Sequence, residues 1–309
     1  MGSRWLVHQA YAASTRIKYG KCVDDFVSWC HATGIRIVST TDMDETLCDY
    51  IFYLFEESLG RSKAVATVYG IVALFPAWRR SFPTALMSLK GWARIAPTIS
   101  HPPLSWDLCV LVAWELVRRG YPCYALGVLL SFDCLLRINE LLALTFEDVS
   151  LPGDLRLSGA RPAQVLIRLK HTKTGKNQWV QVRHPFIIEW LSRHLASSRS
   201  GERLFPYEAC FARCLFKSTA GQLGLPPSIV PHSLRHGGAT ALHLSGESME
   251  DILLRGRWAS SKSARVYIQL GKALLLDLQL PQSLVTTAAL VAADLQHSFA
   301  LLGLSFGKV

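Results

Sequence analysis

Residues 129–144 read Leu-Leu-Ser-Phe-Asp-Cys-Leu-Leu-Arg-Ile-Asn-Glu-Leu-Leu-Ala-Leu. A stretch this apolar, free of glycine and proline, predicts a largely buried helix at the centre of a domain. Arg137 and Glu140 are three residues apart, so they share one face of that helix. An isolated Arg-x-x-Glu pair is usually a surface ion pair. On a rigid buried helix, however, a guanidinium held by a carboxylate is a preorganised fork for a phosphate.

The composition limits the class of protein. The chain has 309 residues, of which 50% are apolar, and 33 Lys and Arg against 23 Asp and Glu give a net charge of +10. These values exclude a disordered or collagen-like chain and leave room for two domains with apolar cores. The positive surplus suggests a polyanionic partner, nucleic acid first and an acidic membrane surface second.

Neither a membrane span nor a secretory signal is predicted. The best apolar candidate, residues 124–136, is too short to cross a bilayer and carries Asp133. Residues 1–6 contain no apolar signal core. We therefore expect a soluble intracellular protein with no membrane partner.

The eight cysteines show no Cys-x-x-Cys motif and no spacing with histidine that suits a metal. Cys210 and Cys214 lie one helical turn apart, but no histidine is spaced to complete a zinc site with them. The cysteines are therefore interpreted as reduced core residues, and no metal or other cofactor is expected.

Residues 1–95 are predicted to form a small helical domain. Apolar residues recur every three or four positions after Ser14-Thr15 and stop at Gly34, a second helix is capped by Thr41-Asp42, and further helices follow near 63–75 and 83–92. Basic residues gather at the helix ends and are either a solvated face or DNA-phosphate contacts. The candidates for DNA contact are Arg16, Lys18, Lys21, Arg61 and Lys63.

Residues 96–104 contain Pro97, Pro102 and Pro103 without a helical period, which predicts an extended linker. A second domain, 105–309, begins with helices over 107–119 and 124–144. Val165, Ile167 and Leu169 then alternate in a strand, a turn is predicted over 174–177, and a second strand returns. Helices are expected over roughly 185–199, 207–223, 232–245, 248–255, 261–270 and 285–303. The fold class is mainly α with a small antiparallel β-sheet.

Pro231 and the small residues after it predict a helix start, with His232 and Arg235 on one face of its first turn. Free backbone N–H groups and the helix dipole favour an anion at such an end. A histidine there is also often a structural cap. The presence of both side chains favours a phosphate site.

Two further segments carry reactive groups. Gly256-Arg257-Trp258 predicts a turn, followed by a short helix that carries Tyr267. A tyrosine is a poor nucleophile unless a base and positive charge help to remove its proton, and most tyrosines are packing residues. Lys173 lies at the tip of the strand pair, where it is either a solvated lysine or a proton donor to a leaving oxygen. Lys170 and Lys176 compete with it for that role.

In chain order, Arg137, Lys173, His232, Arg235, Trp258 and Tyr267 resemble the active-site set of the tyrosine recombinase (phage integrase) family. Leu-Leu-Arg-Ile-Asn-Glu-Leu at 135–141 is similar to the family's first arginine box, and His-Ser-Leu-Arg-His-Gly-Gly-Ala-Thr at 232–240 to its second. Trp258 stands where most members have a second histidine, a variation that Cre recombinase shares. The N-terminal region is similar to that of recombinases of eukaryotic mobile elements such as Cryptons and DIRS-like elements.

The resemblance implies the DNA breaking-rejoining enzyme fold, with 1–95 as a SAM-like core-binding domain and 105–309 as the catalytic domain. It also implies a site-specific recombinase or integrase, active in DNA integration and transposition, in which Tyr267 forms a 3′-phosphotyrosyl intermediate. Arg137, Arg235 and Trp258 would bind the phosphate, His232 would take the tyrosine proton, and Lys173 would protonate the departing 5′ oxygen. Glu140 would orient Arg137 or His232.

Further DNA contacts are expected from Lys170, Lys176, His236 and Arg257. Two alternatives stay open: a type IB topoisomerase, and a catalytically silent DNA-binding protein that uses 232–245 and 248–255 as a helix-turn-helix.

The expected partners are double-stranded DNA and further copies of the chain, as a dimer on one site and a tetramer in synapsis. In the predicted helix 285–303, an apolar stripe is formed by Val285, Ala288, Ala292, Leu295, Phe299 and Leu302. This stripe would dock on its own domain or on a neighbouring protomer. The protein would act in the nucleus of a eukaryote or the cytoplasm of a bacterium.

Overall fold

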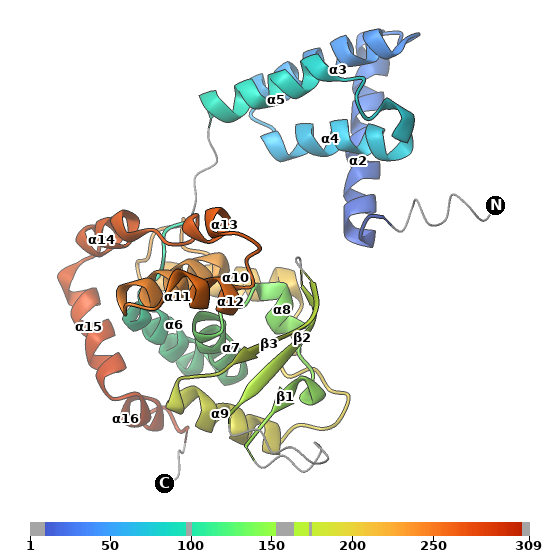
Figure 1. Cartoon of the computed structure of the whole chain (residues 1–309). Helices are drawn as coiled ribbons and strands as arrows, with labels where there is room; N and C mark the ends of the chain where they lie inside the picture. Colours follow the sequence, from blue (N-terminus) through green and yellow to red (C-terminus); the bar gives the residue numbers. More distant parts are fainter. Residues whose placement is uncertain (1–9, 97–100, 153–163, 173–174, 305–309) are drawn as a thin grey trace. The chain divides into compact units, whose positions relative to one another are not determined.

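The computed structural model describes residues 10–96, 101–152, 164–172 and 175–304 (Figure 1). The chain divides into two compact units, Met1–Ile99 and Ser100–Val309, and each is described by itself. The division lies inside the proline-containing segment 96–104. The roles assigned above to the two units remain predictions.

The first unit is helical. Its described elements are α2 (Ala13–Thr33), α3 (Thr40–Glu56), α4 (Arg61–Leu74), the 3₁₀ turn η1 (Pro76–Trp78) and α5 (Pro83–Ile95). α2 ends at Gly34 in the left-handed conformation, as predicted. The predicted cap of α3 was wrong, because Ser39 accepts from the Asp42 N–H and Asp42 accepts from the Ser39 N–H.

A buried carboxylate joins two helices of this unit. Asp44 in α3 is 6% exposed and accepts hydrogen bonds from the backbone N–H groups of Thr84 and Ala85, at 3.0 and 2.9 Å. Both donors lie in the first turn of α5, where N–H groups lack helical partners. Apolar side chains from α2 to α5, including Phe26, Tyr50 and Leu89, complete the core.

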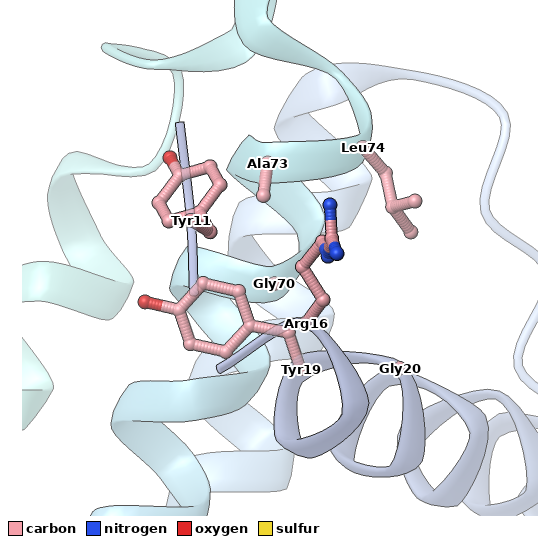
Figure 2. A pocket seen from close by; sticks show the side chains of 7 residues that line it. All are labelled: Tyr11, Arg16, Tyr19, Gly20, Gly70, Ala73 and Leu74. Carbon is pink, nitrogen blue, oxygen red and sulfur yellow. The ribbon is translucent and has the colours of Figure 1, made fainter. Parts of the chain in front are cut away.

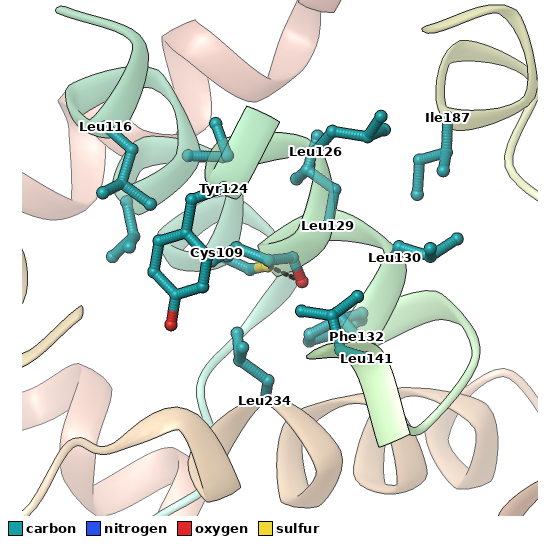
Figure 3. Packing of buried hydrophobic residues seen from close by; sticks show 14 of the residues in the cluster. Cys109, Leu116, Tyr124, Leu126, Leu129, Leu130, Phe132, Leu141, Ile187 and Leu234 are labelled. Atoms are coloured by element: carbon teal, nitrogen blue, oxygen red, sulfur yellow. Dashed lines mark hydrogen bonds between the residues drawn. The ribbon is translucent and has the colours of Figure 1, made fainter. Parts of the chain in front are cut away.

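The second unit is mostly helical. Its described helices are α6 (Trp106–Arg118), α7 (Pro122–Asp133), α8 (Ile138–Leu142), α9 (Pro185–Ala196), α10 (Ala209–Gln222), α11 (Pro231–Leu244), α12 (Met249–Gly256), α13 (Ser261–Arg265), α14 (Leu270–Gln279), α15 (Gln282–Ala293) and α16 (Leu295–Ala300), with a 3₁₀ turn η2 (Phe146–Asp148). The apolar helices α6 and α7 pack together in its centre. Figure 3 shows Tyr124 and Leu129 of α7 beside Cys109 of α6. The mainly α class with a small sheet is confirmed.

The described sheet has three antiparallel strands in the order β1 (Val149–Ser150), β2 (Leu166–Thr172) and β3 (Gly175–Gln181). Val149 pairs with Ile167, and Thr172 pairs with Gly175. The strand pair was predicted, whereas β1, which is two residues long, was not. The turn prediction over 174–177 was wrong, because β3 already begins at Gly175.

The predicted continuous helix over 124–144 is broken. α7 ends at Asp133, and Leu135 adopts a positive φ of 51°. The Leu136 N–H reaches back to the Ser131 carbonyl at 3.0 Å, which closes the end of the helix in a Schellman-like turn. Arg137 is therefore the residue that precedes the new helix α8 and does not lie in the middle of a long one.

Two further helix predictions were wrong in detail. α13 ends at Arg265, so Tyr267 lies in the turn that follows rather than within a helix. The predicted helix 285–303 is two helices, because Asp294 breaks α15 and its side chain caps α16 by accepting from the His297 N–H at 3.0 Å.

No single helix among the described residues has the length and apolar character needed to cross a membrane. One bent pair, Ser261–Gln279 with Gln282–Ala293, meets the length and composition criteria together, at an angle of 111°. α15 of that pair packs against α6 within its own unit.

Candidate active site

The close approach of α11 to the end of α7 depends on two glycines. A Cβ atom on Gly238 would lie 2.3 Å from the Phe132 carbonyl oxygen, and one on Gly237 would lie 1.9 Å from the Leu104 carbonyl oxygen. A larger residue at Gly238 would push α11 away from α7, and one at Gly237 would push it away from the segment that precedes α6. The Gly-Gly pair thus brings the first turns of α11 against the break between α7 and α8.

Arginines satisfy the backbone carbonyls at that break. The Leu135 carbonyl accepts from a terminal nitrogen of Arg235 and, at 2.7 Å, from Nη2 of Arg257. The Cys134 carbonyl accepts from Nη1 of Arg257 at 3.2 Å. Positive groups suit the C-terminal end of a helix, where carbonyls carry the negative end of the dipole.

Glu140 links two arginines. Its carboxylate accepts from the backbone N–H and from Nη1 of Arg137, at 2.9 and 2.6 Å, and from Nη2 of Arg257 at 3.0 Å. Burial raises the pKa of Glu140, but the charge of Arg257 and the contacts from Arg137 outweigh burial and leave that pKa below its usual value. Of the two partners predicted for Glu140, the structure shows Arg137. Arg257, rather than His232, donates to the other carboxylate oxygen.

Tyr267 lies among the rings of α11 and the turn at Trp258. Its ring centroid is 4.6 Å from His236, nearly parallel at 26°, and 4.7 Å from Trp258. The His232 ring meets it edge-on at 5.3 Å. Cζ of Arg235 lies 5.2 Å from the Tyr267 centroid and 4.5 Å from the Trp258 centroid. The tyrosine is thus surrounded by two histidines, an indole and a cation.

Both histidines are neutral at neutral pH. Burial, followed by the charge of Arg235, lowers the pKa of His232 to about 4. Burial, followed by His232, lowers the pKa of His236 to about 4. A neutral imidazole can accept a proton, as a general base must.

Arg235 is completely buried. Its two terminal nitrogens donate to the carbonyls of Leu135 and Gly256. Burial, with Arg137 and Arg257 nearby, lowers its pKa to about 9, so it keeps its charge at pH 7. Nε of Arg235 and Nε1 of Trp258 are buried and have no hydrogen-bond partner among the described residues. Buried donors of this kind are costly in a closed structure, which suggests that a ligand satisfies them.

The structure brings together Arg137, Glu140, His232, Arg235, Trp258 and Tyr267. Lys173 lies outside the described residues, as does the side chain of Lys176. Lys170 is paired with Asp148 at 2.9 Å and also donates to Thr145.

Two predicted DNA contacts are instead interior residues. His236 is 3% exposed and Arg257 is 6% exposed, and their described partners belong to the site itself. The fold turns both side chains inward.

The candidate DNA contacts of the first unit differ in accessibility. Lys18 and Lys21 are exposed. Lys63 pairs with Asp25 at 2.8 Å, and Nε of Arg61 donates to the Leu89 carbonyl at 3.1 Å. Arg16 lines a pocket of about 110 Å³ beside Tyr11 and Tyr19 (Figure 2).

Sequence reasoning missed two residues near Tyr267. Thr240 donates its hydroxyl to the Tyr267 carbonyl at 3.3 Å, and His101 lies with its ring centroid 6.4 Å from His232. Thr240 could have been found, because positions 232, 236 and 240 repeat every four residues and share one face of a helix. His101 lies far from the motifs in the chain, so no local pattern indicates it.

The chain matches the model of the phage integrase family over residues 119–273. It is 25% identical over 273 residues to tyrosine recombinase XerD of Corynebacterium glutamicum, a match that covers 78% of this chain and 84% of that protein.

Solved structures resemble the fold at low identity. The Tn1549 transposon integrase in complex with transposon right end DNA gives a TM-score of 0.61 at 11% identity, covering 90% of this chain and 96% of that one. A lambda integrase dimer bound to a COC′ core site gives 0.60 at 13% identity, covering 86% and 92%.

The family match and the fold together define an enzyme that breaks and rejoins DNA strands. The chain belongs to the phage integrase family, and its activity is that of a tyrosine-type site-specific DNA recombinase.

Proposed function

We propose that Tyr267 is the nucleophile of this recombinase. Its phenolic oxygen attacks a DNA phosphorus, a 3′-phosphotyrosyl bond forms, and the bond to the 5′ oxygen breaks. The observation that carries the proposal is the arrangement around Tyr267, with a neutral histidine and a guanidinium within ring-contact distance. Together they supply the base and the positive charge that an unactivated phenol lacks.

Arg137 and Arg235 neutralise the non-bridging oxygens of the scissile phosphate, since phosphoryl transfer depends mainly on positioning and charge stabilisation. Arg137 is partly exposed and held by Glu140, which suits a preformed contact. Arg235 would exchange one of its backbone carbonyl partners for a phosphate oxygen. The buried Nε1–H of Trp258 is available as a third donor.

His232 accepts the proton of Tyr267, and Lys173 gives a proton to the departing 5′ oxygen. The low pKa of His232, about 4 without DNA, supports the neutral form that a base requires. A bound phosphate adds negative charge beside it and would bring that pKa closer to neutrality. No metal or other cofactor is included in this mechanism, since arginines supply the positive charge.

We also propose that the protein binds double-stranded DNA, with two copies on one site and four in synapsis. The structural relatives named above are DNA complexes, one of them a dimer. The exposed Lys18 and Lys21 support a phosphate-binding surface on the first unit. Mobile-element integration inside the cell is the proposed setting.

The test uses the full chain and proceeds in two stages. DNA that remains attached after denaturing purification is sequenced to recover the target. A nicked duplex of that sequence then traps the covalent adduct, because the short fragment with the free 5′ hydroxyl diffuses away after cleavage. We expect the adduct with the wild-type chain and with Tyr121→Phe as the matched control, but none with Tyr267→Phe. An adduct on the Tyr267→Phe protein would overturn the assignment.

A further inference from the structure

One face of α11 holds the segment that carries Tyr267. His232, His236 and Thr240 follow one another at intervals of four residues, so they form a single row along the helix. His232 meets the edge of the Tyr267 ring, whereas His236 stacks on its face with centroids 4.6 Å apart. Of these neighbouring rings, His236 lies most nearly parallel to Tyr267.

The same row also fixes the backbone. The Tyr267 carbonyl accepts from Nδ1–H of His236 and from the hydroxyl of Thr240, both at 3.3 Å. The Gln269 N–H donates to Oγ1 of Thr240 at 3.2 Å. α13 has already ended at Arg265, so these contacts bind the Tyr267 carbonyl and the Gln269 N–H, which lie outside a helix.

His236 contacts Tyr267 both through its ring and through its Nδ1–H. It is 3% exposed, and the Tyr267 ring covers one face of its imidazole. Thr240 is also 3% exposed. Their low exposure and their contacts with Tyr267 favour an effect on the reaction through Tyr267.

We propose that His236 and Thr240 are positioning residues that fix the backbone and ring of Tyr267 for attack on the phosphate. The inference rests on the proposed role of Tyr267 as nucleophile. Small displacements of a nucleophile reduce the rate of attack strongly, because the near-attack geometry is lost. A tyrosine outside any helix depends on such contacts more than one within a helix.

Three variants separate the backbone contacts from the ring contact. Thr240→Val keeps the side-chain shape but removes the hydroxyl, and His236→Phe keeps an aromatic ring but removes the donor. His236→Asn has an amide N–H near the position of Nδ1 but no ring. His243→Asn is the matched control, since His243 is exposed in the last turn of the same helix.

Two measurements are made on the full chain. Hydrogen exchange of the Gln269 amide, without DNA, reports whether the Tyr267 segment is held. Single-turnover cleavage of the nicked duplex defined above reports the rate and the half-saturating DNA concentration. Thr240→Ser restores a hydroxyl and should recover both.

We expect Thr240→Val to speed exchange at Gln269. Thr240→Val and His236→Phe should each cleave about three- to tenfold more slowly, the range for loss of one hydrogen bond. Their double variant should lose up to about a hundredfold, because the Tyr267 carbonyl then has neither donor. Exchange in His236→Asn should stay slow while its cleavage rate falls. DNA half-saturation should stay within about twofold in all of them.

Wild-type cleavage rates in both Thr240→Val and His236→Phe would overturn the inference. So would a fall in rate that is fully explained by weaker DNA binding, since that result would indicate a DNA contact. The outcome is distinguishable from failure of the proposed function. If the proposed function failed, Tyr267→Phe would still form the adduct, whatever the His236 variants do.

Discussion

Glu140 shows how one buried residue organises the site. Its two carboxylate oxygens serve two arginines, one beside the candidate phosphate position and one beneath the break between α7 and α8. The backbone N–H of Arg137 is bound as well, so the same carboxylate fixes both ends of that residue. A carboxylate at 6% exposure is tolerated only because its negative charge is compensated on both sides.

Glu140→Gln should therefore weaken both folding and cleavage. The amide keeps the volume but removes the charge between Arg137 and Arg257, and leaves one of its donors facing a guanidinium. We expect a loss of about 2–4 kcal/mol in the free energy of unfolding, measured by urea titration. Cleavage should fall because Arg137 is no longer held.

Glu247→Gln is the matched control for this change. Glu247 pairs with Arg183 at 2.6 Å on the surface, where both side chains are substantially exposed. Its loss should cost less than about 1 kcal/mol. Equal effects of the two substitutions would contradict the role given to Glu140.

The two histidines beside Tyr267 predict a dependence of stability on pH. Their folded-state pKa values are about 4, below the ~6.5 of an unfolded chain. Between these values the unfolded chain binds protons that the folded chain does not. The stability that the neutral histidines contribute to the folded chain is therefore fully present above about pH 6.5 and is lost as the pH falls towards 4.

Between pH 7 and pH 5 the loss should be roughly 2 kcal/mol for each histidine as an upper value, seen as a lower urea midpoint at pH 5. The double variant His232→Asn with His236→Asn should lose much less over that interval. His243→Asn should behave as the wild type. A pH dependence that is unchanged in the double variant would show that other groups cause it.

At the scale of the element, the position of α11 rests on Gly237 and Gly238. Replacing Gly238 with alanine would place a methyl group 2.3 Å from a carbonyl oxygen of α7, and backbone at that point has little room to move. We expect Gly238→Ala to destabilise the protein by more than about 3 kcal/mol. Thermal unfolding measures the effect.

Gly221→Ala is the control and should change the free energy of unfolding in the opposite direction. Gly221 lies in α10, with open space around its Cα and an ordinary helical φ. Alanine there should stabilise the protein by about 0.5–1 kcal/mol, because it restricts the unfolded chain. If Gly238→Ala failed to destabilise the protein, the close contact between α11 and α7 would be refuted.

The sequence predicts elements better than it predicts their interruptions. The start of α11 follows from Pro231, and the end of α2 from Gly34, because both signals are local. The break at Leu135 could not be predicted. An apolar residue with a positive φ opposes its own propensity, and the arginines that satisfy the freed carbonyls lie a hundred or more positions away in the chain.

The predictions for the candidate site show the same limit. Residue types in chain order indicated Arg137, His232, Arg235, Trp258 and Tyr267, which the structure gathers. The orientation of His236 and Arg257 depends on which face each element buries. Such burial is a property of the packed unit, so the sequence alone could not show that both side chains are buried.

At the scale of the whole second unit, the C-terminal helices cover α6 and α9. Phe299 is fully buried against Phe186 and Trp190, at centroid distances of 5.3 and 5.4 Å. The indole N–H of Trp114 donates to the Ser298 carbonyl at 3.0 Å. Of the two dockings left open by the apolar stripe, the structure of the single chain shows the one on its own unit.

Phe299→Ala should therefore cost about 3–5 kcal/mol of unfolding free energy, the range for a buried phenylalanine. Leu301→Ala, two residues further on and 72% exposed, should change it by less than about 0.5 kcal/mol. Denaturant unfolding of the DNA-free protein tests both.

The dependence of Tm on protein concentration distinguishes docking of the tail within one chain from exchange between two chains. A tail bound to its own unit makes unfolding a unimolecular event, so the midpoint should not depend on protein concentration. A tail bound to a partner adds an association step, and a hundredfold dilution would then lower Tm by several degrees. We expect Tm to stay constant within about 1 °C over that range without DNA. A Tm that falls on dilution in the wild type but not in Phe299→Ala would show that the tail exchanges between chains even in the absence of DNA.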